Sequence, residues 1–170
     1  MTVPDALRAV ENQAAALLAV EGLATWFSTE RGTIRSVDGV DLTVGRGETL
    51  ALVGESGSGK SVTSLSIMGL VPEPAGRIVA GAIRLRGKDG QVRDLAKLDE
   101  RALQRIRGND VAMIFQEPMT SLNPVRRVGD QIAEAIRLHE PVGARAALAR
   151  AEELLRRVDI PDPGLGLWRI

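Results

Sequence analysis

Cysteine is absent from this sequence, and histidine occurs once, as His139. Without cysteine the chain can form neither a disulfide framework nor a thiolate metal site, and one histidine cannot make a histidine cluster around a metal. No apolar run reaches about 18 residues, the length that a membrane-spanning helix requires. Because Asp5 and Glu11 interrupt the first residues, we also expect no signal peptide. Any role at a membrane would therefore depend on a partner.

An excess of charge of either sign is also lacking, since 22 Lys and Arg balance 22 Asp and Glu. Proteins that bind nucleic acid normally carry a basic excess, so we expect no nucleic-acid partner. Hydrophobic residues make up 44% of the chain and charged residues 26%, which is typical of a globular protein. A length of 170 residues suits one domain or part of something larger.

The strongest motif is the glycine-rich segment Gly54–Ser61. Before it, Thr49–Val53 is a continuous apolar run that predicts a strand buried on both faces. After it, Val62–Leu70 has a helical pattern that ends near Gly69. The order of strand, glycine loop and helix is the context that a phosphate-binding P-loop requires.

The residue types in this loop suit the phosphates of a nucleotide. The glycines allow backbone angles closed to other residues, so successive N–H groups can turn inward onto an anion. The helix start adds unpaired N–H groups, Lys60 supplies a mobile charge for the β- and γ-phosphates, and the Ser61 hydroxyl can ligate Mg²⁺. We therefore predict these nucleotide-binding residues: Gly54, Glu55, Ser56, Gly57, Ser58, Gly59, Lys60, Ser61 and Val62.

The rest of the chain predicts an α/β protein, in which a mixed sheet domain is followed by helices. Apolar residues alternate with polar ones in the predicted strands and recur at helical spacing in the predicted helices. The further predicted strands are Leu17–Phe27, Ile34–Val44, Gly76–Gly87 and Val111–Phe115, and the further predicted helices are Leu98–Ile106, Val128–Ile136 and Ala144–Val158.

A second motif selects among P-loop proteins. Met113–Pro124 reads Met-Ile-Phe-Gln-Glu-Pro-Met-Thr-Ser-Leu-Asn-Pro and resembles the Q-loop of the ATP-binding cassette (ABC) transporters, in the form found in the peptide/nickel importer branch. Gly47–Ser61, Val37–Val40 and Ile106–Gly108 are similar to the same branch, and the resemblance runs from about residue 17 to about residue 163. It implies an incomplete ABC ATPase domain: a P-loop NTPase core sheet, a flanking antiparallel β region and the start of a helical subdomain.

The resemblance also implies roles for single residues. Gln116 would position the attacking water and ligate Mg²⁺ together with Ser61, although Gln116 taken alone reads as an exposed loop glutamine. The family usually stacks an aromatic residue on adenine, but the loop Ser28–Thr33 contains none. Arg31 could stack on the base instead, or Phe27 could do so, unless Phe27 belongs to the core.

By the same resemblance, residues 1–16 form an N-terminal extension, 17–124 a partial nucleotide-binding core, 125–160 the start of a helical subdomain and 161–170 an irregular tail. The implied function is ATP binding as the energising subunit of an importer for peptides, with ATP hydrolysis in the complete protein. The implied partners are transmembrane permease subunits, a second ATP-binding subunit and, indirectly, an extracytoplasmic solute-binding protein. The implied location is the cytoplasmic face of the membrane, through the permease.

Three later motifs of the family are missing after Pro124: the Leu-Ser-Gly-Gly-Gln signature, the apolar strand that ends in the Walker B carboxylates, and the switch histidine. Hydrolysis needs a carboxylate for Mg²⁺ and a group that positions water, so the enzymatic activity of this chain stays open. One alternative is a truncated fragment without hydrolysis or independent activity. Another is a P-loop kinase or GTPase, for which we find no acceptor site or base-specifying motif.

Overall fold

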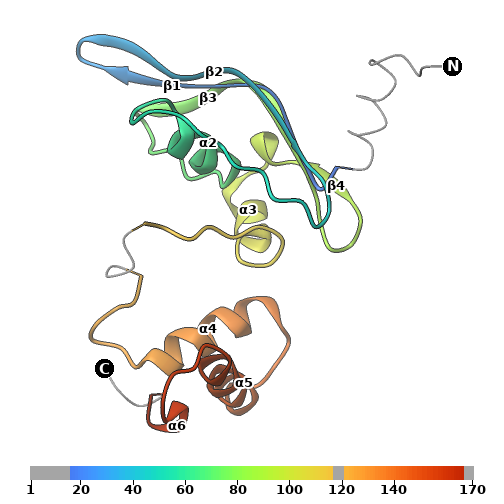
Figure 1. Ribbon diagram of the computed structural model, residues 1–170, viewed down its shortest axis with the longest axis vertical. Coiled ribbons are helices and arrows are strands. Elements are labelled where there is room, and N and C mark those ends of the chain that lie inside the picture. Colours follow the sequence, from blue (N-terminus) through green and yellow to red (C-terminus); the bar gives the residue numbers. More distant parts are fainter. Residues whose placement is uncertain (1–15, 117–120, 167–170) are drawn as a thin grey trace, which may run out of the picture. The chain divides into compact units, whose positions relative to one another are not determined.

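The computed structural model describes residues 16–116 and 121–166 (Figure 1). Nearly all of the expected N-terminal extension and four residues of the expected Q-loop, 117–120, lie outside this part. The chain divides into two compact units, Met1–Ala112 and Met113–Ile170. The functional boundaries predicted from the sequence stay predictions.

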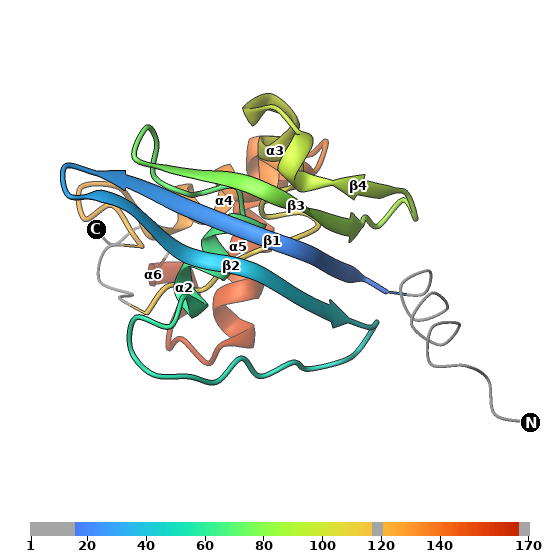
Figure 2. The same cartoon turned by 90° about the horizontal axis from the view of Figure 1, so that it is seen from above.

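The first unit is built on one antiparallel sheet with the strand order β2-β1-β3-β4. Its strands are β1 (Leu18–Thr29), β2 (Gly32–Val44), β3 (Gly76–Arg86) and β4 (Val92–Asp94). Figure 2 shows the long β1–β2 hairpin and β3 lying side by side. The three long strands confirm the alternating patterns in the sequence, whereas the three-residue β4 was not predicted.

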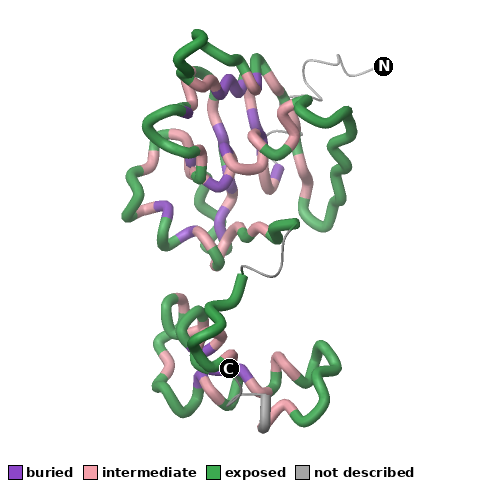
Figure 3. Tube along the Cα trace, turned by 90° about the vertical axis from the view of Figure 1, so that its left-hand side faces the viewer, coloured by how far each residue is buried: buried purple, intermediate pink, exposed green. Residues whose placement is uncertain are grey.

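Three helical elements accompany this sheet: α2 (Lys60–Ile67), the 3₁₀ turn η1 (Leu95–Lys97) and α3 (Glu100–Ile106). The core joins the strands to η1 and α3, and the buried stretches of the strands stand out in Figure 3. Burying such aliphatic side chains contributes roughly 1.5–3 kcal/mol each. The core residues are Val20, Leu23, Val37, Ile83, Leu85, Leu95, Leu103 and Ile106.

Two segments predicted to be buried strands are not strands. In 49–53 the side chains lie in the open, with Leu52 48% exposed and Val53 89% exposed. In 111–115 Val111 makes only an isolated bridge to Arg107, and Ile114 is 97% exposed. An apolar run becomes a buried strand only when other strands pair with its edges. No strand among the described residues pairs with either segment, so both predictions were wrong.

The second unit contains α4 (Val128–His139), α5 (Ala144–Arg157) and the one-turn α6 (Pro163–Gly166). The apolar stripes of the sequence predicted the first two helices correctly. Where α4 and α5 meet, the buried positions are filled by alanines at 133, 147 and 151, whose small side chains let helices approach closely. The tail, expected to be irregular, thus begins with a helical turn. No helix in the described ranges 16–116 and 121–166 is long and apolar enough to cross a membrane.

Candidate nucleotide-binding site

The glycine loop leads directly into α2, which begins at Lys60. Gly59 is the N-cap residue in a left-handed conformation with φ 88°, and no side chain caps the helix. The first turn contains no acidic residue. The first N–H groups of a helix have no partner within the helix, and they carry the positive end of its dipole. This uncapped helix start is therefore suited to an anion.

Gly59 also allows the loop to approach the sheet closely. A Cβ atom at this position would lie 2.3 Å from the carbonyl oxygen of Ser36 in β2, far inside contact distance. Gly57 has a similar φ of 82°, but a Cβ atom there would meet nothing within 4 Å. The two glycines thus have different tasks: Gly57 turns the chain, whereas Gly59 turns it against the backbone of β2.

The ammonium group of Lys60 lies over the loop itself. Its Nζ donates hydrogen bonds to the carbonyl oxygens of Gly54 and Glu55, at 2.7 and 2.6 Å, and to Oγ of Ser58 at 3.1 Å. These hydrogen bonds therefore hold the positive charge of Lys60 close to where a phosphate would meet the start of the helix. A bound phosphate would replace these neutral acceptors with charged oxygens, which form stronger hydrogen bonds.

Buried hydroxyl groups hold α2 against the sheet. Oγ of Ser66 lies 2.8 Å from Oγ1 of Thr25 in β1, both residues are completely buried, and Ser66 donates to the carbonyl of Val62 at 2.7 Å. Thr63 fixes the helix start, since its Oγ1 donates to the carbonyl of Gly59 at 3.0 Å. Neither Thr25 nor Ser66 can be predicted from the sequence, because a hydroxyl residue in a strand and one in a helix give no local signal that they meet.

Ser61 and Gln116, the predicted Mg²⁺ ligands, are both exposed. Mg²⁺ is usually held by one or two protein oxygens together with phosphates and water, so the Ser61 hydroxyl in the first turn of α2 fits one such ligand. The described part of the chain holds no group of three or more acidic or histidine residues that could bind a metal without phosphates. Because Gln116 belongs to the second unit and Ser61 to the first, their joint action stays a prediction.

Trp26 and Arg35 form an unexpected pair on the β1–β2 hairpin. They face each other across the two strands, and the Arg35 guanidinium lies 4.6 Å from the centre of the indole ring. The indole Nε1 is buried and has no hydrogen-bond partner. Phe27 packs against Gly76 of β3, where a Cβ atom would lie 2.5 Å from its ring, so that ring is engaged in packing. Arg31 lies exposed in the hairpin turn, and its contact with a base stays a prediction.

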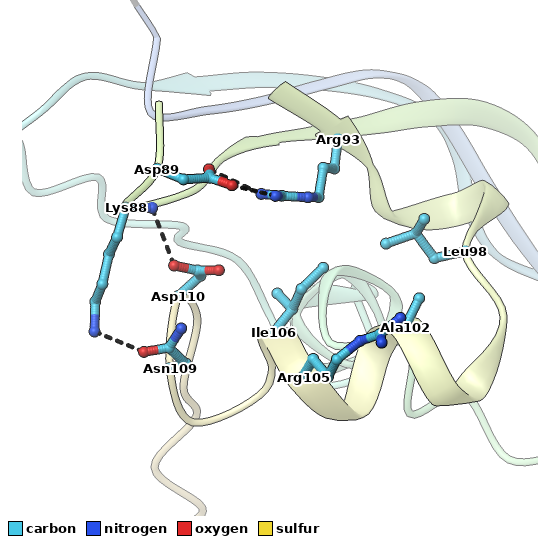
Figure 4. A pocket seen from close by; sticks show the side chains of 9 residues that line it. All are labelled: Lys88, Asp89, Arg93, Leu98, Ala102, Arg105, Ile106, Asn109 and Asp110. Carbon is cyan, nitrogen blue, oxygen red and sulfur yellow. Dashed lines mark hydrogen bonds and ion pairs between the residues drawn. The ribbon is translucent and has the colours of Figure 1, made fainter. Parts of the chain in front are cut away.

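A separate cavity of about 460 Å³ lies between the β3–β4 turn and α3 (Figure 4). Arg93 pairs with Asp89 at this cavity, the Lys88 backbone N–H donates to Asp110 at 3.0 Å, and the Lys88 Nζ donates to Asn109 at 3.0 Å. The hydrogen bonds from Arg93 and from the Gln91 N–H hold the pKa of Asp89 below its ordinary value. None of the predicted site residues lines this cavity, so it lies apart from the glycine loop.

A glycine loop followed by a helix with an uncapped start, which packs on a sheet, is the defining feature of the P-loop class of phosphate-binding folds. Within that class, residues 37–165 match the family model described as "ABC transporter". The chain belongs to the ABC transporter family, as the sequence resemblance implied, and its fold is a partial α/β ABC ATPase domain.

Named relatives come from the importer branch of this family. The chain is 60% identical, over 86% of its length, to a Brucella abortus protein named "Putative peptide import ATP-binding protein". It is 52% identical, over 84% of its length, to the oligopeptide transport ATP-binding protein AppD of Bacillus subtilis. These matches cover 43% and 42% of the two relatives. The chain thus spans less than half the length of the curated relatives that it matches.

Solved structures support the same fold. The dimeric ABC transporter cassette MJ0796 superimposes with a TM-score of 0.69 at 20% identity, over 85% of this chain and 58% of that one. A post-hydrolysis form of the same cassette, bound to ADP and Pi, gives a TM-score of 0.68 at 19% identity. At this level of identity the likeness concerns the fold alone.

Proposed function

We propose that this chain binds Mg-ATP at the loop 54–62 and that it is the energising part of an ABC importer for peptides. The observation that carries the proposal is the uncapped start of α2 with the Lys60 ammonium held over the loop. Family membership supports the nucleotide, and the names of the relatives support the peptide substrate.

In this proposal the backbone of the loop, Lys60, Ser61 and Gln116 have separate tasks. The N–H groups of the loop and of the first turn of α2 donate to phosphate oxygens. Lys60 moves its ammonium from the carbonyls of Gly54 and Glu55 to the β- and γ-phosphates. The Ser61 hydroxyl holds Mg²⁺, which offsets phosphate charge when bound. Gln116 is expected to position water at the γ-phosphate.

The wider assembly belongs to the same proposal. An import ATP-binding subunit works with transmembrane permease subunits, with a second ATP-binding subunit and, indirectly, with an extracytoplasmic solute-binding protein. We place the chain at the cytoplasmic face of the membrane, attached through the permease. The names of the peptide-import relatives support these partners, and the cassette MJ0796 was solved as a dimer.

A second candidate is a nucleotide binder that does not hydrolyse ATP. It is favoured by the exposure of the apolar segment that precedes the loop, where Val53 is 89% exposed. It is also favoured because the described residues contain no group of three or more acidic or histidine side chains that could hold a metal ion. Mg²⁺ would then be held by Ser61, phosphates and water without a protein carboxylate.

Calorimetric titration of the 170-residue chain with Mg-ATP tests the nucleotide site. Removal of a charge-assisted contact costs about 1.5–3 kcal/mol, so Lys60→Ala should weaken binding by roughly tenfold to a hundredfold or more. Lys97→Ala is the matched control, because Lys97 is exposed and pairs with Asp94, away from the loop. Equal affinities of the wild type and Lys60→Ala would refute the assignment of Lys60 to the phosphates.

A further inference from the structure

The far end of α2 is held by a residue from another helix. The helix ends in a left-handed glycine, Gly69, with φ 61°. The N–H of Leu70 donates to the carbonyl of Leu65, and the N–H of Gly69 donates to that of Ser66. This is the Schellman arrangement, which satisfies two of the last carbonyls of a helix. The carbonyls of Met68 and Gly69 lie beyond it.

Arg107 of the α3 C-cap supplies the donors for these two carbonyls. Its Nε donates to Met68 at 2.8 Å, and its Nη2 donates to Gly69 at 2.6 Å. Its Nη1 donates to the carboxylate of Glu100 at 2.7 Å. The side chain is 18% exposed. The last turn of α2 contains no basic residue of its own, so Arg107 supplies the cation that favours a helix C-terminus.

The contact is too close for another residue at position 69. A Cβ atom on Gly69 would lie 2.8 Å from Cδ1 of Leu103 and 3.1 Å from Nη2 of Arg107. Leu103 belongs to the core. The end of α2 therefore packs directly on α3. Two nitrogens of the Arg107 guanidinium bind the end of α2, and the third binds Glu100 of α3.

Arg107 also begins the segment that leads to Gln116. Its backbone forms a bridge with Val111, and the N–H of Gly108 donates to the carbonyl of Val111 at 2.8 Å, which closes a turn. The chain then passes into the second unit at residue 113. The Arg107 side chain thus connects the end of α2, the helix that follows the phosphate loop, to the start of the segment 108–116. This segment carries Gln116, the residue predicted to position water.

We propose that Arg107 is a positioning residue that transmits nucleotide binding at the loop to the segment 108–116. The inference rests on the proposed function, because it requires a nucleotide at the start of α2. A helix of eight residues is a hydrogen-bonded rod about 12 Å long, so a displacement at its phosphate end also moves its last carbonyls. Through two short hydrogen bonds the guanidinium follows, and the turn 108–111 is displaced with it.

Hydrogen–deuterium exchange of the 170-residue chain, with and without Mg-ATP, tests this inference. In the wild type we expect nucleotide to slow exchange in the loop and to change it in peptides from 108–116. In Arg107→Gln we expect the same loop protection, an affinity within about threefold of the wild type, and a response at 108–116 reduced about tenfold or more. Arg105→Gln is the matched control, because Arg105 is an exposed arginine on the same helix and should leave both responses unchanged.

Glu100→Gln provides a second, milder variant, since Glu100 is exposed and accepts a hydrogen bond from the Nη1 of Arg107. We expect it to keep the fold and the affinity while lowering the response at 108–116. An unchanged response in both variants, with loop protection intact, would overturn the role of Arg107 and leave the proposed function standing. Lack of protection anywhere in the wild type would overturn the proposed function and this inference with it.

Discussion

Gly59 and Gly57 allow a test of how tightly the phosphate loop is seated. Both have positive φ, so alanine at either position should cost about 1–2 kcal/mol for the left-handed backbone. Only at Gly59 would the new Cβ atom also meet the Ser36 carbonyl of β2, at 2.3 Å, and overpacking of this kind costs roughly a further 1–3 kcal/mol. We therefore expect Gly59→Ala to lower the free energy of unfolding clearly more than Gly57→Ala.

Urea unfolding of the two variants, followed by circular dichroism, measures this difference. Equal losses in the two variants would mean that the loop does not approach β2 as closely as described. Nucleotide affinity adds a second readout, because the N–H groups that Gly59 positions belong to the proposed phosphate site. We expect Gly59→Ala also to weaken Mg-ATP binding more than Gly57→Ala does.

At the scale of single residues, the sequence predicts which side chains of the loop would meet a phosphate, but it does not predict what they contact in the folded chain. The spacing of glycines, Lys60 and Ser61 identifies a P-loop because backbone conformation and helix start are local properties. The hydrogen bond between Thr25 and Ser66 joins residues 41 positions apart. The hydrogen bond from Arg107 to the carbonyl of Met68 likewise joins residues 39 positions apart. Contacts of this kind depend on how the elements pack, which no local pattern encodes.

Asp94 connects three elements of the first unit, and it gives a prediction at the scale of elements. It ends β4 and caps η1, and its carboxylate accepts hydrogen bonds from the N–H of Ile83 in β3, at 3.1 Å, and of Ala96, at 3.3 Å. Lys97 pairs with it at 3.2 Å. Asp94→Ala removes the cap and leaves the Ile83 N–H without its acceptor, so we expect a loss of about 1–3 kcal/mol in the free energy of unfolding.

The pH dependence of this loss separates charge from capping. Burial raises the pKa of Asp94, but the N–H of Ile83, Lys97 and the N–H of Ala96 outweigh that effect and lower it overall. Since the folded pKa is lowered, the stabilisation is complete above the unfolded pKa of about 3.9 and is lost as pH falls through the folded value. Asp94→Asn keeps a capping oxygen, so its difference from the wild type should be constant above about pH 5 and should shrink on further acidification. A difference that grows in acid would contradict this assignment.

Element prediction succeeded where an element finds its partners within the chain. The alternating segments became strands because β1 pairs with both β2 and β3. The apolar faces of α4 and α5 pack on each other and bury their alanines. The prediction failed for 49–53 and 111–115, whose composition is that of fully buried strands. Composition indicates the surroundings that a segment is suited to, whereas strand formation depends on a neighbour that supplies hydrogen bonds. The three-residue β4 and η1 were missed because they are too short to show a period.

At the scale of the whole molecule, we predict that purified residues 1–170 bind nucleotide without hydrolysing it. The phosphate loop, Lys60 and Ser61 are present, but the Walker B carboxylates that would hold Mg²⁺ and position water are missing from the sequence after Pro124. Those two functions account for several orders of magnitude in the rate of phosphoryl transfer. Exposed Leu52 and Val53 directly before the loop further predict self-association, because uncovered apolar residues favour aggregation.

Phosphate release at saturating Mg-ATP measures the rate of ATP hydrolysis. The Lys60→Ala variant, purified in parallel, reveals any contaminating ATPase. We expect turnover below about 0.1 per second, a tenth of the lower end for typical enzymes, and the same value in the mutant. A faster rate that disappears in Lys60→Ala would show that the 170 residues hydrolyse ATP and would exclude the non-hydrolysing candidate. Mg-ATP binding measured by calorimetry, together with phosphate release no faster than that of Lys60→Ala, would support the non-hydrolysing candidate. Such a result would mean that the chain contains the phosphate-binding groups but not the groups that activate water.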